Sequence, residues 1–453
     1  MLLLGCGSPP SSFYQLVYSS HIKLRRMHPY SILKVGRKPW KNSIYSRKKV
    51  LMPDSLKVLF ICNKSPWPPG EGGPIAMNNL ITGLLEAGHQ VKVLAVNSNK
   101  YAVKPEDIPS EYKKTSGIEL AYVDLSIKPV NAFLNLFSNK SYHVERFISK
   151  AFNEKLIEIL NRDRFDIVQI ETLYMTPYIG TIRTYSEARI FLRAHNIEHM
   201  IWQRIMESTK NPIKKWYLKH LVRTLKNYEY SSLEKYDGII PISHVDAAFF
   251  TSNTKTPVKA ISFGVDPTQI ELEAYGDPEQ ALFHIGSMNW VPNIEGVKWF
   301  LDEAWPLIHE SYPKLKLYLA GRGMPDWINQ LQLKNVEVVG EVPDAYEFIK
   351  SKAISIAPLF SGSGIRIKII ESMAQARAVI STTIGAEGIN YTNGENIMIA
   401  DDKQTFLEAV KWLYADPVRS KKMGENARKL ILQQHNNKLL IEQMVDFYRE
   451  VIK

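Results

Sequence analysis

The chain has few cysteines, and this shortage limits its chemistry. Only Cys6 and Cys62 occur among its 453 residues, and Cys6 lies in an unusual N-terminal segment. A disulfide framework is therefore implausible, and a reducing compartment, most simply the cytoplasm, is expected. The sequence also has no run of about 18 apolar residues, so it predicts no transmembrane helix.

Several motifs that carry chemistry are missing as well. The sequence contains no Cys/His cluster with metal-ligand spacing, no G-x-S-x-G elbow and no P-loop lysine motif. Zinc enzymes, serine hydrolases and ATPases are thereby disfavoured. We expect no metal and no resident cofactor.

Acidic residues are missing from the first 50 positions, which hold ten Lys/Arg. The formal charge of the chain is +11, so everything after this segment carries only +1. This balance argues against nucleic-acid binding by the globular part. Residues 1–51 also lack sustained periodicity. We predict a disordered basic leader over residues 1–51, and the alternative is a basic arm at an anionic membrane surface.

From residue 52 onward the pattern predicts two α/β domains. Short apolar runs alternate with helical patterns, which is typical of parallel sheets covered on both faces. A ligand cleft is expected where the carboxyl ends of the two sets of strands face each other. The expected strands are 57–62, 89–96, 118–125, 167–171, 190–193 and 238–242 in the first series, and 281–285, 316–320, 336–339, 354–357, 378–381 and 396–399 in the second.

Two long helical stretches accompany these series. One runs over about 201–235, is interrupted near Asn211-Pro212, and is rich in Lys, Trp and Tyr. We predict that its aromatic side docks on the first domain, although its basic face leaves a membrane-lying helix open. The other stretch, about 402–452, is longer than the second domain needs.

The most informative stretch is 357–374, with the sequence APLFSGSGIRIKIIESMA. A strand ends in a Ser/Gly turn that opens a helix, so free N–H groups and the helix dipole favour a bound diphosphate. Lys368 and Glu371 then share one helical face. A lysine can neutralise phosphate while a carboxylate accepts hydrogen bonds from ribose hydroxyls. The alternative, a strand-turn-helix with a solvated Lys/Glu pair, is equally compatible with these residue types.

Two further motifs follow predicted strands of the first series. Gly70-Glu71-Gly72-Gly73-Pro74 comes after the first strand, and its glycines allow close approach to phosphate or sugar, unless it is merely a flexible loop. His195 follows the strand at 190–193, where α/β folds place active groups, but a structural histidine is as common there.

Together these residues resemble the retaining GT-B glycosyltransferases of family four, from about Leu56 to the C-terminus. The order and spacing of the motifs carry the resemblance: Gly72-Gly73, Arg193-x-His195-Asn196-x-Glu198, Asp237-Gly238-x-x-x-x-Ser243, Phe263-Gly264-Val265-Asp266, Ala320-Gly321-Arg322-Gly323, Glu371-Ser372-Met373-Ala374 and 378–382.

The resemblance implies two facing Rossmann-like domains with a C-terminal helix returning to the first. After the leader predicted over 1–51, it assigns an acceptor domain to 52–262, a nucleotide-sugar domain to 263–435 and the returning helix to 436–453. It also implies the donor site: Glu371 on the ribose, Ser363 and Gly364 near the diphosphate, Gly72 and Gly73 near the donor phosphates, His195 near the donor sugar, and Gly286, Asn289 and Arg322 as further donor contacts.

Two departures from the family pattern matter. A second glutamate often stands eight positions before the one matching Glu371, and here Ser363 stands there. An Arg and a Lys often follow the first strand of the second domain, and here 286–290 (GSMNW) and Asn293 occupy that region. We hypothesise that Arg366 and Lys368 supply the missing positive charge.

The resemblance thus predicts a retaining glycosyltransferase that moves a sugar from a nucleotide-sugar donor to a hydroxyl of a glycan or lipid-linked acceptor in cell-surface polysaccharide synthesis. His195, Arg366, Lys368 and Glu371 are the candidate catalytic residues. Localisation in the cytoplasm is expected, with peripheral contact with the inner face of the membrane left open. The alternatives are a nucleotide-sugar epimerase of the same fold and a catalytically weak sugar-nucleotide-binding protein.

Overall fold

The computed structural model describes residues 55–70, 72–266, 277–362 and 364–453. The leader predicted over 1–51 and the predicted donor contact Ser363 lie outside the described residues. We call 55–262 the first half and 277–434 the second half.

The first half is built on a parallel six-stranded sheet with the strand order β3-β2-β1-β4-β5-β6. In the central register, Val58 of β1 lies opposite Val91 of β2 and Ile167 of β4. The first strand of this half therefore lies in the middle of the sheet, and the later strands extend each side in turn. The parallel sheet predicted from the alternating pattern is confirmed. The strands are β1 Lys57–Cys62, β2 Gln90–Ser98, β3 Glu119–Val123, β4 Ile167–Glu171, β5 Arg189–Ala194 and β6 Gly238–Pro241.

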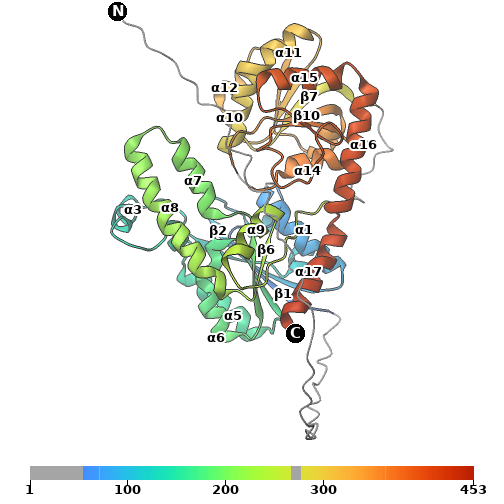
Figure 1. Cartoon of the computed structure of the whole chain (residues 1–453). Coiled ribbons are helices and arrows are strands. Elements are labelled where there is room, and N and C mark those ends of the chain that lie inside the picture. The colour runs from blue at the N-terminus through green and yellow to red at the C-terminus, as the bar shows by residue number, and fades with distance from the viewer. Residues whose placement is uncertain (1–54, 71, 267–276, 363) are drawn as a thin grey trace, which may run out of the picture. The chain divides into compact units, whose positions relative to one another are not determined.

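Three helices of the first half, α5, α8 and α9, begin at side-chain caps. Ser149 Oγ accepts a hydrogen bond from the Phe152 N–H at the start of α5, and Asn211 Oδ1 accepts one from the Lys214 N–H at the start of α8. The α-helices, labelled in part in Figure 1, are α1 Gly72–Glu86, α2 Ser110–Ser116, α3 Pro129–Asn135, α4 Tyr142–Glu145, α5 Lys150–Arg162, α6 Ile179–Tyr185, α7 Glu198–Ser208, α8 Pro212–Ser232 and α9 His244–Asn253.

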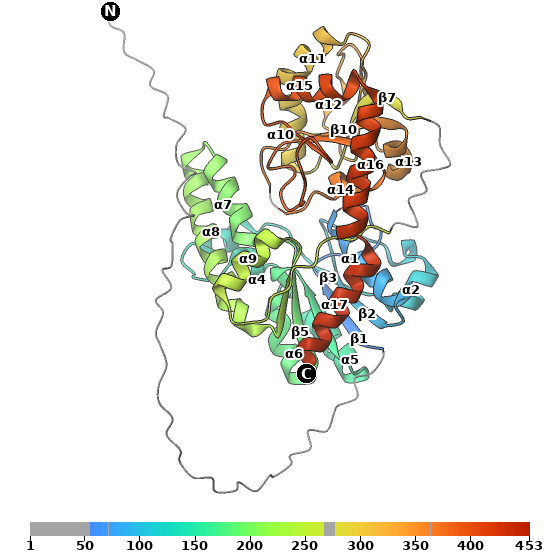
Figure 2. The same cartoon turned by 45° about the vertical axis from the view of Figure 1, so that its right-hand side comes forward.

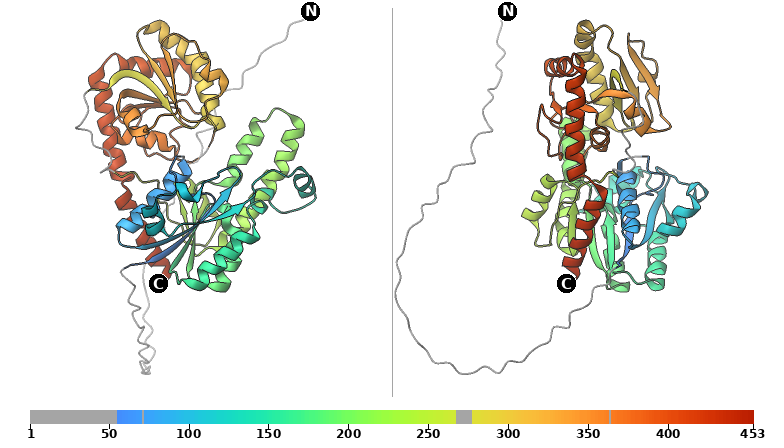
Figure 3. Two further views of the ribbon diagram at one scale, coloured as in Figure 1. Left: turned by 180° about the vertical axis from the view of Figure 1, so that it is seen from behind. Right: turned by 90° about the vertical axis from the view of Figure 1, so that its right-hand side faces the viewer.

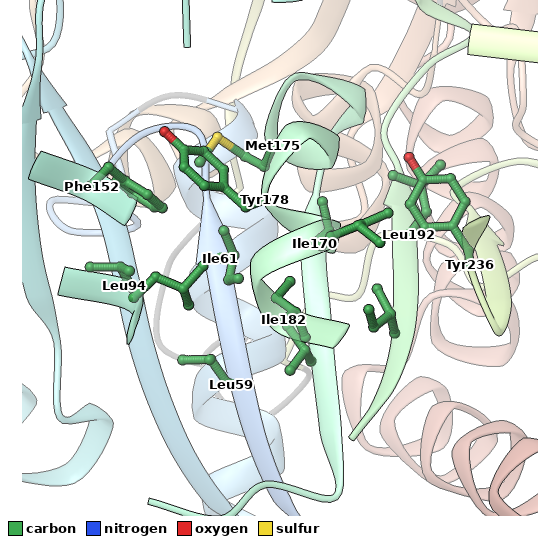
Figure 4. Close-up of a cluster of buried hydrophobic side chains, with 14 of the residues drawn as sticks. Leu59, Ile61, Leu94, Phe152, Ile170, Met175, Tyr178, Ile182, Leu192 and Tyr236 are labelled. Carbon is green, nitrogen blue, oxygen red and sulfur yellow. The ribbon is translucent and has the colours of Figure 1, made fainter. Parts of the chain in front are cut away.

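The central strands of the first half are buried on both faces because most of their residues are apolar. Alternate residues serve opposite faces: Leu59 and Ile61 face one core cluster, and Val58 and Phe60 face another. Figure 4 shows the first cluster, in which Phe152 of α5 and Ile182 of α6 lie over the strands.

The second half repeats the plan with a parallel sheet in the order β12-β11-β10-β7-β8-β9. Its strands are β7 Glu279–Ile285, β8 Leu317–Ala320, β9 Val336–Gly340, β10 Lys352–Ala357, β11 Ala378–Ser381 and β12 Met398–Ile399. Its α-helices are α10 Val291–Trp299, α11 Trp305–Ser311, α12 Asp326–Asn329, α13 Ala345–Lys350, α14 Ile367–Ala374, α15 Lys403–Tyr414 and α16 Pro417–Gln434.

The last helix, α17 (Asn437–Ile452), belongs to the core of the first half. Between α16 and α17 the chain meets the segment that links the halves: Val265 N donates to His435 O at 2.7 Å, and Asn437 N donates to Val265 O at 3.0 Å. Leu440, Met444 and four further buried residues of α17 then pack against β1 and α1. Figure 2 follows α16 into α17.

These observations confirm the predicted fold class, two Rossmann-like α/β units with a C-terminal helix that returns to the first. The domain boundaries at 262/263 and 435/436 and the cleft between the domains stay predictions. The predicted long helix is two helices, α7 and α8, divided at Thr209–Asn211. Within the described ranges, the structure has no helix that is both long and apolar enough to cross a membrane.

Candidate functional site

Most of the predicted site residues follow the carboxyl ends of β1, β5, β7, β8 and β10. Gly72 and Gly73 open α1 directly after the β1 loop, and His195 follows β5 by one residue. Gly286 follows β7, and Arg322 follows β8 by two residues. Parallel strands bring these ends to one edge of each sheet, which explains why residues far apart in sequence share a region.

Gly364 marks the contact between the two sets of loops. Its φ is +80°, and a Cβ placed on it would lie 2.6 Å from Oδ1 of Asn196 and 3.3 Å from the carbonyl O of His195. Both the left-handed backbone and the close approach require glycine here. The loop before α14 therefore lies directly against the loop that carries His195.

Lys368 is held in the first turn of α14 by residues near the end of β7. Its Nζ is 2.7 Å from Oδ1 of Asn293 and 3.4 Å from Nε2 of His284. Asn293 donates in turn from Nδ2 to the Ser287 carbonyl at 2.7 Å. Burial, followed by the nearby charge of Arg366, lowers the pKa of Lys368 well below its usual value. A bound anion would offset both effects.

His284 is the buried support of this lysine. Its side chain is inaccessible to solvent, and its Nδ1–H donates to the Ile356 carbonyl at 3.0 Å. Nε2 is then the acceptor that faces Lys368. Burial, followed by the charge of Lys368, lowers the pKa of His284 well below 6.5, so the ring is neutral and can accept from the ammonium.

Arg366 lies just before α14 and is largely enclosed by its own loop. Only 4% of it is exposed, its guanidinium carbon lies 5.3 Å from the centre of the Trp290 ring, and its Nη1 donates to the Gly364 carbonyl. Burial lowers its pKa to about 10, against the opposing effect of Glu387. The guanidinium stays charged at neutral pH, and its hydrogen bond to the Gly364 carbonyl stabilises the glycine loop, residues 362 and 364–366 before α14.

Glu371 lies one turn beyond Lys368 on α14. Among the described residues no donor lies within hydrogen-bond distance of its carboxyl, and no ion pair joins it to Lys368. Burial of the carboxyl raises its pKa to about 7. Tyr346 of α13 is a neighbour: burial, followed by the charge of Glu371, raises the pKa of that phenol. Both side chains are partly buried and they do not pair with each other, which differs from the solvated Lys/Glu pair considered from the sequence.

The turns after β7 and β8 are interlocked. A Cβ on Gly321, whose φ is +140°, would lie 1.8 Å from the Gly286 carbonyl, and one on Gly323 would lie 2.4 Å from Oδ1 of Asn289. Arg322 between these glycines pairs with Glu341 at 2.8 Å (Nε to Oε1) and is 47% exposed. The predicted donor contacts Gly286, Asn289 and Arg322 are thus neighbours, and Arg322 is the accessible cation among them.

His195 is oriented by a buried chain of hydrogen bonds that runs to the C-terminal helix. Its Nε2 is 2.6 Å from Oε2 of Glu171, the last residue of β4. Gln169 Nε2 donates to the other carboxyl oxygen of Glu171, and the Tyr448 hydroxyl of α17 donates to Gln169 Oε1. Glu171, Gln169 and Tyr448 are each 0% exposed.

Arg193 offsets the negative charge of Glu171 in this hydrogen-bond network. It is 1% exposed, and its guanidinium donates to the carbonyls of Ile261 and Ser262, in the segment that leads to the second half. Burial lowers its pKa to about 10, whereas the charge of Glu171 acts in the opposite direction. The same buried network therefore joins the β5 motif, the linking segment and α17.

Helix α7 also connects the first half to the loop before α14. Arg204 donates to the Gly362 carbonyl, and its Nη2 lies 3.3 Å from Oε1 of Glu387. The glycine loop before α14 is thus contacted from the first half by both the His195 loop and α7.

The sequence did not indicate the residues that position His195 and Lys368. Glu171, Gln169 and Tyr448 carry no local motif, since they meet only after three separate segments pack together. His284 is the one polar residue in the predicted apolar strand 281–285, and that interruption was the only sequence signal that could have marked it. Lys64 was also missed; it follows β1, and its Nζ would lie 3.3 Å from a Cβ on Gly73.

Comparisons with known proteins agree with this architecture. Residues 279–416 match the family model described as glycosyl transferases group 1. The chain is 21% identical over 401 residues to an uncharacterized 44.6 kDa protein in the cps region of Klebsiella pneumoniae, a match that covers 84% of this chain and 97% of that protein.

Solved structures share the fold at low sequence identity. The sucrose-phosphate synthase of Thermosynechococcus elongatus has a TM-score of 0.64 at 16% identity and covers 87% of this chain and 99% of its own. HepE of Anabaena in complex with UDP has a TM-score of 0.62 at 12% identity and covers 87% of this chain and 100% of its own. Residues 279–416 therefore resemble group 1 glycosyl transferases, and the chain as a whole has the GT-B fold of these structures.

Proposed function

We propose that the protein transfers a glycosyl group from a nucleotide-sugar donor to a hydroxyl of a glycan or lipid-linked acceptor, with retention of anomeric configuration. The observation that carries the proposal is the Lys368 ammonium, held by Asn293 and His284 one helical turn from Glu371. A desolvated cation next to an unpaired carboxyl suits a diphosphate and a ribose. The similar HepE structure contains UDP, which supports a nucleotide donor.

In this proposal the hard step is departure of the nucleoside diphosphate. The bond between the anomeric carbon and the diphosphate oxygen breaks, and the acceptor oxygen forms the new bond to that carbon. The leaving phosphate takes the acceptor proton, as the family resemblance implies. Lys368 and Arg366 stabilise the charge that grows on the diphosphate, which is the electrostatic contribution expected to dominate.

The first half supplies the other reaction partners. Gly72 and Gly73 let the start of α1 approach the donor phosphates, and His195 contacts the donor sugar with its orientation set by Glu171. Closure of the two halves excludes water, which would otherwise hydrolyse the donor. We further propose a cytoplasmic location, polysaccharide synthesis as the setting, and no requirement for a metal or cofactor.

The first test is a thermal-shift screen of nucleotide sugars and nucleoside diphosphates, followed by turnover with the best donor. We expect stabilisation by one family of nucleotide sugars and transfer to a hydroxyl acceptor, with the product anomer read by proton NMR. An inverted anomer would overturn the retaining mechanism. Conversion of the donor sugar at C2 without transfer would instead indicate an epimerase. Binding with no turnover of any donor would indicate a sugar-nucleotide-binding protein.

A further inference from the structure

The segments around α3 and the start of α8 leave an unusual number of large apolar side chains in solvent. Phe137 is 80% exposed, Ile213 is 78% exposed and Val130 is 69% exposed. Soluble proteins rarely gather exposed apolar groups without an interaction partner. The full set of exposed apolar residues here is Ile127, Val130, Phe133, Leu134, Phe137, Ile213 and Trp216.

These residues lie on neighbouring segments because α3 packs on α8. His220 Nε2 of α8 lies 3.0 Å from the Asn135 carbonyl at the end of α3. On its inner side, Ala132 of α3 packs against the buried Leu218 and Leu221 of α8. Figures 1 and 3 show α3 beside α8 from opposite sides. The inner side of α3 is thus packed against α8, while no element among the described residues covers its outer side.

The same two segments are strongly basic. Residues 127–140 and 210–226 contain eight Lys/Arg and no Asp/Glu, although the chain after residue 50 carries a net charge of only +1. Lys128 and Lys140 pair with Asp124 and Glu145. The other six form no ion pair within the described part of the chain: Lys210, Lys214, Lys215, Lys219, Arg223 and Lys226. We call these eight residues and the seven apolar ones the basic apolar surface.

The surface is also connected to the candidate site. α7 starts at Glu198, three residues after His195, and its far end leads through Thr209–Asn211 into α8. Its 11 residues span about 16 Å at 1.5 Å per residue. The basic apolar surface therefore begins about one helix length from the loop that carries His195.

We propose that the basic apolar surface docks on an anionic lipid bilayer. Phe, Leu, Ile and Trp side chains enter the interface while Lys and Arg contact acidic headgroups, a combination typical of helices that lie on membranes. Docking there places His195 within reach of an acceptor whose lipid remains in the bilayer. This last point rests on the proposed function, whereas docking itself does not.

The test is cosedimentation of the full chain with phosphatidylglycerol/phosphatidylcholine vesicles and with phosphatidylcholine vesicles alone. We expect binding to the anionic vesicles that weakens as salt is raised. Each basic residue near such a surface contributes about 1 kcal/mol, or about fivefold, so Lys219→Gln/Arg223→Gln should lower the partition coefficient about 30-fold. Ile213→Ser/Trp216→Ser should lower it at least tenfold.

The second half offers matched controls. Val418 is 78% exposed, as is Ile213. Each follows a proline that is the first residue of a helix with a side-chain N-cap. Val418→Ser and Lys421→Gln/Lys422→Gln should bind vesicles as the parent does. The basic leader is present in every variant and cancels in the comparison.

Parental vesicle binding by both surface variants would overturn the proposal, because binding would then come from elsewhere. If the surface variants lose self-association but keep vesicle binding, the surface binds a second copy of the chain and the proposal is wrong. If the surface instead binds RNA in a salt-sensitive way, its partner is a nucleic acid and the proposal is also wrong. Thermal-shift binding of the nucleotide donor should be unchanged in all variants. If donor binding is absent even in the parent, the proposed function fails while docking is still judged by the vesicles.

Discussion

At the residue scale, the site combines groups whose pKa values burial has moved in opposite directions. The pKa of Glu371 is raised to about 7, and that of Lys368 is lowered well below its usual value. Burial therefore disfavours the charged forms of both side chains. A nucleoside diphosphate would reverse this, since ribose hydroxyls donate to the carboxylate and phosphate pairs with the ammonium.

We predict that Glu371→Gln weakens nucleotide-sugar binding at least tenfold, because the loss of one charged hydrogen-bond partner costs about 1.5–3 kcal/mol. In the parent, raising the pH from 6 to 8 converts Glu371 to its carboxylate, so this residue should strengthen binding as pH rises through about 7. Calorimetry of the parent and the variant at several pH values measures the difference. Equal affinities at pH 8 would remove Glu371 from the ribose site.

The two cations are expected to act on the transition state more than on the bound donor. The charge that they meet grows as the glycosidic bond breaks, so Lys368→Met and Arg366→Met should each lower kcat more than they raise the donor KM. Surface substitutions usually cost under about 0.5 kcal/mol and would change turnover by about twofold or less. Near-parental kcat in both folded variants would contradict the assignment and move the diphosphate contact to Arg322 or to backbone groups.

At the scale of elements, the loop before α14 is the piece that joins the two halves at the site. It is contacted by the His195 loop through Gly364 and by α7 through Arg204. The sequence predicts a helix opening directly from the Ser/Gly turn, but α14 begins only at Ile367. The reason is that Gly362 and Gly364 both have positive φ and Arg366 is extended, so the helix cannot start before them.

We predict that Gly364→Ala lowers the free energy of unfolding by more than Gly394→Ala does. Both glycines have φ of +80°, which costs an alanine about 1 kcal/mol, but only Gly364 has an atom within 4 Å of the added Cβ. Denaturant unfolding gives the difference, and donor turnover should fall only in Gly364→Ala. Equal effects on stability and on turnover would mean that the approach to Asn196 is not maintained in solution.

At the scale of the whole molecule, α17 ties the C-terminus to the candidate site. The Tyr448 hydroxyl reaches Glu171 through Gln169, and Glu171 holds His195. Arg193 joins the same network to the segment that links the halves. The orientation of one histidine thus depends on segments from β4, β5 and the last helix.

We predict that Tyr448→Phe costs about 1–3 kcal/mol of stability, because it leaves a buried acceptor on Gln169 unsatisfied. It should also lower kcat by loosening His195, with donor affinity little changed. Tyr112→Phe is the matched control, since the buried Tyr112 hydroxyl has no hydrogen-bond partner among the described residues and its loss should be neutral or stabilising. Denaturant unfolding and steady-state kinetics measure both. A Tyr448→Phe protein as stable and as active as the parent would show that the chain of hydrogen bonds does not orient His195.

The sequence by itself determined the local features of this protein. Short apolar runs located the strands, glycine-rich segments located two of the loops that follow them, and motif order indicated the GT-B fold, because these properties depend on neighbouring residues. Only the tertiary structure decided that His284 supports Lys368, that Glu371 is desolvated and that Tyr448 reaches His195. Each of those contacts joins residues at least 80 positions apart or depends on burial, and no local pattern records what another segment will place beside a side chain.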